Sequence, residues 1–222
     1  MPIDMTLVQK LAVWALPVLL AITVHEASHG YVARALGDPT AEALGRLSLN
    51  PLRHIDPVGT ILVPAVLLAL GGFLFGWAKP VPVNMRNLGH PRRDMALVAA
   101  AGPLSNCAMA LGWGLLLKFA LAGGDEGVWL GLRYMAIAGI VINLVLMVLN
   151  LLPLPPLDGG RVLTGLVPEH VARQFDRIEP YGLLILVILL ATGLLGRVLY
   201  WPLTLAEAAL FAILGLPPAT AL

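Results

Sequence analysis

His25, Glu26 and His29 form the most chemically informative motif in the sequence, His-Glu-x-x-His. Residues four apart on an α-helix lie one turn apart on the same face, so the two imidazoles point to the same side. This pair is a common zinc-binding arrangement, and the neighbouring glutamate can take a proton from an attacking water. Residues 11–24, directly before the motif, carry no charged side chain. The motif therefore predicts a metal-dependent hydrolytic site inside an apolar, membrane-spanning helix.

Asp158 is the best candidate for a third metal ligand, because zinc in hydrolytic sites is commonly held by three protein ligands and a water. It follows a long uncharged run, where a carboxylate needs a functional reason to be present. The prolines within residues 153–156 are expected to end the preceding helix, and Gly159 and Gly160 allow the backbone to approach closely. The sequence thus predicts one zinc ion per chain, bound by His25, His29 and Asp158.

The composition indicates an integral membrane protein. Of the 222 residues 59% are hydrophobic and 12% charged, and the mean hydropathy is +0.86. Ordinary soluble domains are about a quarter charged. The net charge of +1 gives no indication of a nucleic-acid partner. The lipid bilayer, specifically the cell (inner, cytoplasmic) membrane, is the expected location.

Uncharged stretches predict an all-α polytopic bundle of about five to six transmembrane or re-entrant segments, because about 20 residues are needed to cross a bilayer. The expected segments are residues 6–35, 57–77, 95–121, 132–152, 181–195 and 198–214. The whole chain, 1–222, is interpreted as one domain with a core at about 6–165 and C-terminal helices at about 181–215. Residues 45–51 predict a short strand and turn, and the prolines of 77–84 exclude a helix and predict an extended, edge-like segment. These are the short cytoplasmic-side β-strands we expect, with 45–49 and 81–84 as candidate edges for pairing with an extended substrate.

Basic residues predict the orientation of the segments. They are concentrated in the loops after 6–35, after 57–77 and after 132–152, whereas the loop near 125 holds Asp125 and Glu126. The positive-inside rule places the first three loops in the cytoplasm. Both flanks of 57–77 then lie on one side, so we expect this segment to form a re-entrant or interfacial hairpin, with a plain transmembrane helix as the alternative. Segments 6–35 and 132–152 would then run in the same direction, which brings Asp158 to the depth of the histidines.

The sequence resembles the site-2 protease family of intramembrane zinc metalloproteases. The resemblance rests on His25-Glu26-x-x-His29, on Leu157-Asp158-Gly159 and on Asn150 eight residues before Asp158. Residues 45–51 (GRLSLNP), 77–84 (WAKPVPVN) and 101–106 (AGPLSN) resemble a compact prokaryotic branch that lacks a PDZ domain.

The resemblance implies a role for each matching residue. His25, His29 and Asp158 would bind zinc, and Glu26 would be the general base. Asn150 would hold substrate or stabilise the oxyanion, and Asn106 is a candidate for substrate contact. The implied activity is endopeptidase cleavage of transmembrane segments of other proteins, with the site toward the cytoplasm. A membrane zinc transporter and a catalytically inactive scaffold or chaperone are the alternatives.

Overall fold

The computed structural model describes residues 5–62, 76, 78–124 and 126–217, and these residues form an all-helical protein. Four helices in this part are long and apolar enough to cross a membrane, and they confirm a multi-pass membrane protein. They are α1 (Leu7–Ala35), α4 (Pro91–Ala122), α5 (Gly127–Asn150) and α9 (Leu194–Leu214). They match the predicted segments 6–35, 95–121, 132–152 and 198–214, with boundaries shifted by a few residues.

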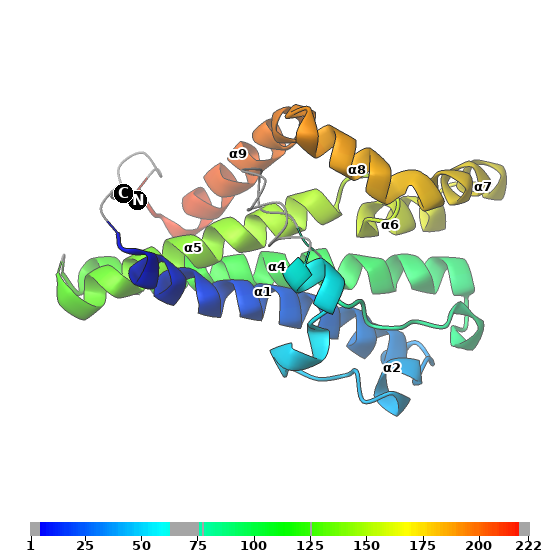
Figure 1. Cartoon of the computed structure of the whole chain (residues 1–222), viewed down its shortest axis with the longest axis horizontal. Coiled ribbons are helices and arrows are strands. Elements are labelled where there is room, and N and C mark those ends of the chain that lie inside the picture. The colour runs from blue at the N-terminus through cyan, green and yellow to red at the C-terminus, as the bar shows by residue number, and fades with distance from the viewer. Residues whose placement is uncertain (1–4, 63–75, 77, 125, 218–222) are drawn as a thin grey trace.

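Helices α1, α4 and α5 pack against one another and form the centre of the molecule (Figure 1). Helices α1 and α5 run in the same direction and α4 runs opposite to both, as the charge distribution predicted. Small residues permit this close packing. Ala110 and Ala136 are fully buried, and Gly139 leaves the space that the Trp113 ring occupies.

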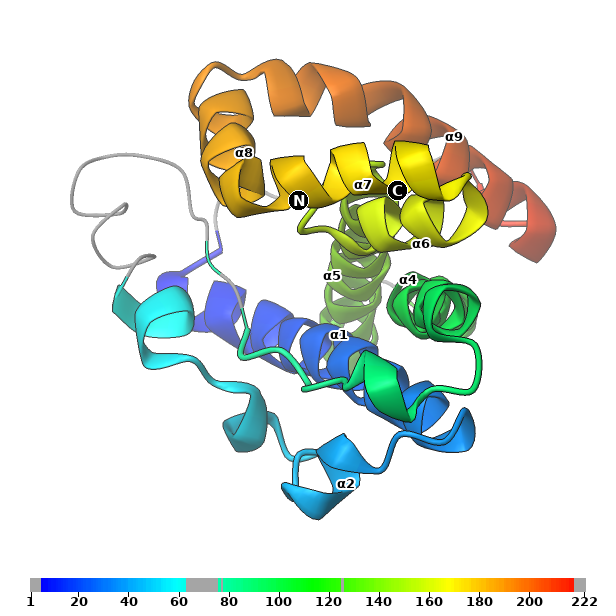
Figure 2. The same cartoon turned by 90° about the vertical axis from the view of Figure 1, so that its right-hand side faces the viewer.

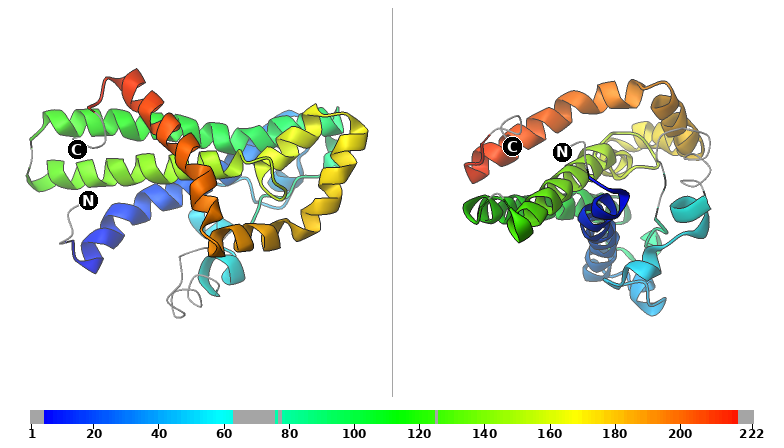
Figure 3. Two further views of the ribbon diagram at one scale, coloured as in Figure 1. Left: turned by 90° about the horizontal axis from the view of Figure 1, so that it is seen from above. Right: turned by 60° about the vertical axis from the view of Figure 1, so that its left-hand side comes forward.

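The described C-terminal part has one candidate span, α9, where two shorter membrane segments, 181–195 and 198–214, were expected. Helix α8 (Gly182–Ala191) is 10 residues long, about 15 Å, which is half of what a bilayer requires. The chain turns at Gly193, whose φ is +70°, and continues as α9. Helix α9 crosses α4 and α5 obliquely (Figure 3), with Leu210 and Phe211 in the apolar core. The predicted segment 181–195 is therefore not a span of its own.

Short elements lie at one end of the bundle, which faces the viewer in Figure 2, and along the side of α1. They comprise α2 (Thr40–Ala43), η1 (Pro51–His54), η2 (Pro57–Leu62), η3 (Met85–Asn87), α6 (Asp158–Leu166), α7 (Glu169–Ile178) and η4 (Glu179–Tyr181). The arginines at the end of α1, at the start of α4 and in α6 and α7 lie at this same end.

The predicted cytoplasmic-side strands at 45–51 and 77–84 are wrong for the part of the chain that the structure describes, which contains no strand. In the first segment, local turns use the backbone N–H groups of Gly45, Arg46 and Ser48, which are therefore not available for a ladder. The two segments are connected through a side chain, since Arg46 Nη2 donates to Lys79 O at 2.9 Å and to Pro80 O at 3.4 Å.

Most of the predicted re-entrant segment, 57–77, lies outside the described residues. Its flanks are described, and they lie side by side: Lys79 N–H donates to His54 O at 2.9 Å. The chain thus leaves and returns beside α1.

Candidate metal centre

Three side-chain atoms from α1 and α6 meet beside α4. His25 Nε2 lies 3.1 Å from His29 Nε2, and Asp158 Oδ2 lies 3.2 Å and 3.4 Å from these two nitrogens. Ligands bound tetrahedrally to zinc at about 2.0–2.1 Å are separated by about 3.3–3.4 Å. The three separations therefore fit three corners of a zinc coordination tetrahedron, and the cluster that the sequence predicted is brought together.

The hydrogen bonds of the imidazoles leave the lone pairs of their Nε2 atoms available. His29 Nδ1 contacts Val98 O at 2.7 Å, and His25 Nδ1 contacts Asn106 Oδ1 at 2.6 Å. Carbonyl oxygens only accept, so each Nδ1 carries the proton and each Nε2 faces the cluster unprotonated. Asp158 Oδ2 is buried and accepts no hydrogen bond from the described residues. Three electron-rich atoms converging in a buried position fit a cation, and this donor set fits zinc.

The turn between α5 and α6 places Asp158. Gly159 and Gly160 follow it, and both pack directly on backbone: a Cβ on Gly159 would overlap Leu151 O, and one on Gly160 would lie 2.6 Å from Pro155 N. The predicted close backbone approach is confirmed. An aspartate carboxyl ordinarily ionises well below neutral pH, and a carboxylate that binds a metal must be ionised.

Gly102 of α4 makes room for the imidazoles. A Cβ at this position would lie 2.5 Å from His25 Cε1 and 2.5 Å from His29 Nε2. In the sequence, residues 99–102 (Ala-Ala-Ala-Gly) form a run of small residues of the kind that suits helix packing. Nothing in a single sequence distinguishes this glycine, because its function comes from a helix that is distant in the chain.

Glu26 lies next to His25 on α1 and contacts a backbone segment from outside the helix. Its Oε2 accepts a hydrogen bond from Val81 N–H at 2.9 Å. The contact places the extended segment 79–84 along α1, beside the metal ligands. Asp38 holds the far end of this segment, since its Oδ2 accepts from Asn84 N–H at 2.6 Å.

The two predicted asparagines lie in different environments. Asn150, at the end of α5, is partly buried and donates to Leu146 O in its own helix at 3.0 Å. Asn106 is fully buried, with 0% exposure, and its oxygen contacts His25. Sequence reasoning missed Asn143 of α5, which is equally buried and donates to Gly139 O at 2.8 Å. The one signal in the sequence was a polar residue within an apolar span.

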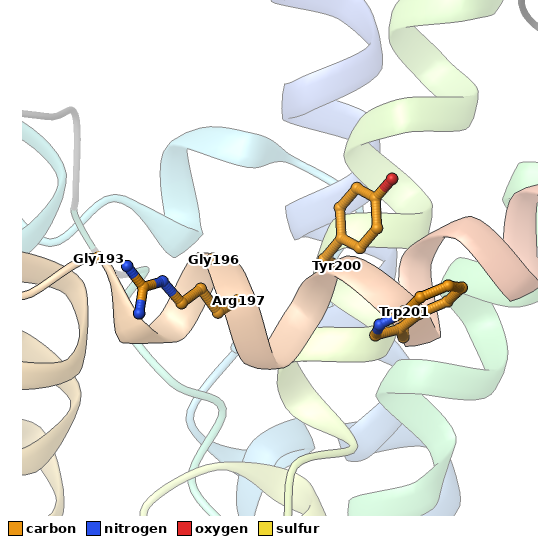
Figure 4. Close-up of a pocket in the computed structure, with 5 residues that line it drawn as sticks. All are labelled: Gly193, Gly196, Arg197, Tyr200 and Trp201. Atoms are coloured by element: carbon orange, nitrogen blue, oxygen red, sulfur yellow. The ribbon is translucent and has the colours of Figure 1, made fainter.

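A cavity of about 440 Å³ lies at the start of α9, away from the cluster (Figure 4). It is lined by Gly193, Gly196, Arg197, Tyr200 and Trp201. None of these is a metal ligand of the cluster, so the cavity is separate from the metal centre.

A His/His/Asp metal centre with an adjacent glutamate, carried by helices that cross a membrane, defines a class: membrane-embedded zinc hydrolases. Comparison with known proteins gives the family. Residues 120–193 match the model of peptidase family M50. The "Putative zinc metalloprotease YwhC" of Bacillus subtilis is 43% identical over 188 residues, which cover 83% of this chain and 82% of that protein.

More distant relatives agree with this result. The "Putative zinc metalloprotease Rip2" of Mycolicibacterium smegmatis is 31% identical over 190 residues, covering 82% of this chain and 70% of that protein. Its namesake in Mycobacterium tuberculosis is 32% identical over 190 residues. No solved structure gives a significant match. The chain belongs to peptidase family M50, the site-2 protease family, and is a zinc metalloprotease.

Proposed function

We propose that this protein is a zinc-dependent intramembrane endopeptidase that cleaves transmembrane segments of other membrane proteins. The observation that carries the proposal is the depth of the metal centre. Helix α1 has 29 residues, about 44 Å, and His25 lies 10 residues, about 15 Å, before its end. A hydrocarbon layer of about 30 Å centred on this helix would contain both histidines, which supports the proposal.

Each residue of the centre has a chemical task in peptide hydrolysis. His25, His29 and Asp158 would hold zinc. When bound, the zinc ion would act as a Lewis acid that activates water and polarises the scissile carbonyl. Glu26 accepts the proton of the attacking water and passes it to the leaving amine. We propose that Asn150 donates its second amide hydrogen to the developing oxyanion, because the first is already bonded to Leu146 O.

Substrate pairing along 45–49 or 81–84 receives less support than the sequence suggested. Val81 N–H is bonded to Glu26, and the carbonyls of Lys79 and Pro80 accept from Arg46. Pro80 and Pro82 have no N–H group. A substrate that pairs here would first have to displace these bonds.

The orientation in the membrane follows from the distribution of charge. The arginines in α7 and at the start of α4 lie at one end of the bundle, where α1 finishes and where α6 begins with Asp158. At the opposite end, Lys118 Nζ donates to Leu214 O and Arg133 donates to Ala120 O and Leu121 O, so both cations bind helix carbonyls. We propose that the arginine-rich end faces the cytoplasm.

The test is cleavage of a fluorescent transmembrane peptide by the full-length protein in lipid nanodiscs. Glu26→Gln should keep one zinc per chain and lower the cleavage rate about 10²–10⁴-fold, the usual contribution of a general base. Glu169→Gln, on the exposed surface of α7, is the matched control and should cleave at the normal rate. Undiminished cleavage by Glu26→Gln would overturn the proposed role. Zinc flux into vesicles without peptide cleavage would indicate a transporter instead.

A further inference from the structure

A chain of buried side-chain hydrogen bonds connects α5 through α4 to the metal ligand His25. Asn143 of α5 and Asn106 of α4 have 0% exposure. Asn106 Nδ2 donates to Asn143 Oδ1 at 2.9 Å, and Asn106 Oδ1 lies 2.6 Å from His25 Nδ1. Burying an amide costs free energy unless its N–H and C=O groups are hydrogen-bonded. The side chains in this hydrogen-bond network are therefore held in one arrangement.

Backbone carbonyls determine which atom donates and which accepts in each hydrogen bond of this network. Asn143 Nδ2 donates to Gly139 O at 2.8 Å, so the Asn143 oxygen must face Asn106. That oxygen, with Ala21 O at 3.3 Å, accepts from Asn106 Nδ2, so the Asn106 oxygen must face His25. The hydrogen between Asn106 and His25 therefore belongs to His25 Nδ1, because the Asn106 oxygen can only accept.

The two histidines differ in how their orientation is maintained. The Nδ1 of His29 is bonded directly to a backbone carbonyl, Val98 O, which no substitution removes. His25 depends instead on a side-chain amide, and an amide presents either its oxygen or its nitrogen depending on its own partners. Asn143 is the partner that selects the oxygen.

We infer that Asn106 and Asn143 are positioning residues that fix the tautomer and the ring orientation of His25, so that its Nε2 lone pair faces the metal. The inference rests on the metal site of the proposed function. It replaces the expected substrate contact of Asn106, because a side chain with 0% exposure offers no surface to a substrate. Asn143 acts on His25 only through Asn106.

The experiment measures zinc affinity directly, by competition with a chelator, on the full-length protein in nanodiscs without peptide. Removing a hydrogen-bonding partner of a ligating histidine typically weakens metal binding about 10- to 100-fold. We expect that loss for Asn106→Leu and a smaller loss for Asn143→Leu. The double variant should match Asn106→Leu alone, because both changes interrupt one chain. Cys107→Ala, at the neighbouring position, is the control and should bind zinc normally.

The Asn106→Asp variant tests whether Asn143 acts by orienting the Asn106 amide or only by packing against it. A carboxylate presents an acceptor oxygen to His25 whichever way it is turned, so it does not need Asn143. Adding Asn143→Leu to Asn106→Asp should therefore cause no further loss of zinc affinity, whereas adding it to the natural Asn106 weakens binding. An equal loss in both backgrounds would show that Asn143 acts through packing alone and would overturn its assigned role.

Two further readouts keep the inference independent of folding and of peptide cleavage. The visible spectrum of the cobalt-substituted protein should change in Asn106→Leu, because the geometry of the His25 ligand changes. The unfolding temperature of the metal-free protein identifies variants that fail to fold, and Asn106→Asp then carries the test. Unchanged zinc affinity in a folded Asn106→Leu protein contradicts the inference. If the protein binds zinc as expected but cleaves no peptide, only the proposed function fails.

Discussion

Gly102 of α4 lies directly against His29 of α1, so close that a Cβ at position 102 would be 2.5 Å from His29 Nε2. Real Cβ atoms do not approach this closely, and both imidazoles are held by hydrogen bonds that prevent them from moving aside. Gly102→Ala should therefore displace a ligand nitrogen and lower zinc affinity at least about 10-fold. Gly112→Ala, on the same helix, is the control, because its Cβ would meet nothing within 4 Å. Equal zinc affinity in the two variants would contradict this prediction.

Gly159→Ala tests the turn that places Asp158. The new Cβ would overlap the carbonyl oxygens of Leu151 and Leu152, so the start of α6 must move away from the end of α5. Asp158 moves with it, and we expect both the zinc content and the unfolding temperature to fall. Gly131→Ala in α5 meets no atom within 4 Å and should leave both unchanged. A stoichiometric zinc content in Gly159→Ala, measured by atomic emission, would argue against this account of the turn.

Arg46→Gln tests the segment that contacts Glu26. Its guanidinium holds Lys79 O and Pro80 O, next to the Val81 N–H that bonds Glu26. Loss of such a hydrogen bond costs about 1 kcal/mol, or about fivefold in an equilibrium. We expect peptide cleavage to fall several-fold while zinc stays bound, because no metal ligand is touched. Arg86→Gln, on the exposed turn η3, is the matched control. A loss of zinc in Arg46→Gln would show that this arginine supports the metal centre itself.

Asp38→Asn tests how the same segment is fixed at its other end. The carboxylate accepts hydrogen bonds from Thr40, from Asn84 N–H and from Asn87 Nδ2. An asparagine amide would turn a donor toward one of these donors, and leaving it unsatisfied costs about 1–3 kcal/mol. The unfolding temperature at pH 7 should therefore be lower in Asp38→Asn, whereas Asp176→Asn on the surface of α7 should have no effect.

The effect of Asp38→Asn should also depend on pH. Burial raises the pKa of the Asp38 carboxyl, but the hydrogen bonds from Thr40, Asn87 and Asn84 outweigh burial and lower that pKa below 3.8. A lowered folded-state pKa contributes stability that is fully present above the unfolded value of about 3.9 and is lost as the pH falls through the folded value. The difference between the two proteins should be constant from pH 7 to about pH 5 and should shrink below about pH 4. A difference that shrinks already near pH 6 would indicate another titrating group.

The sequence predicted the chemistry of the site because that chemistry depends on local patterns. Helical periodicity places His25 and His29 on one face, and an aspartate after an apolar run requires a partner. Charge in the loops predicted that α1 and α5 run in parallel, since each basic loop lies next to the helix end that it orients. The strands at 45–51 and 77–84 were wrong because turns and the Arg46 side chain use the groups that a ladder needs.

The sequence by itself therefore predicted which residues would bind metal, which residue would accept the proton and that the site would lie among membrane helices. Only the tertiary structure decided how the ligands are oriented. Asn106 contacts His25 across 81 residues of sequence, and Val81 contacts Glu26 across 55. Gly102 lies against both imidazoles, and Asn143 reaches His25 only through Asn106. No periodicity in a single sequence encodes such contacts, because they depend on which helix faces pack together and at which depth.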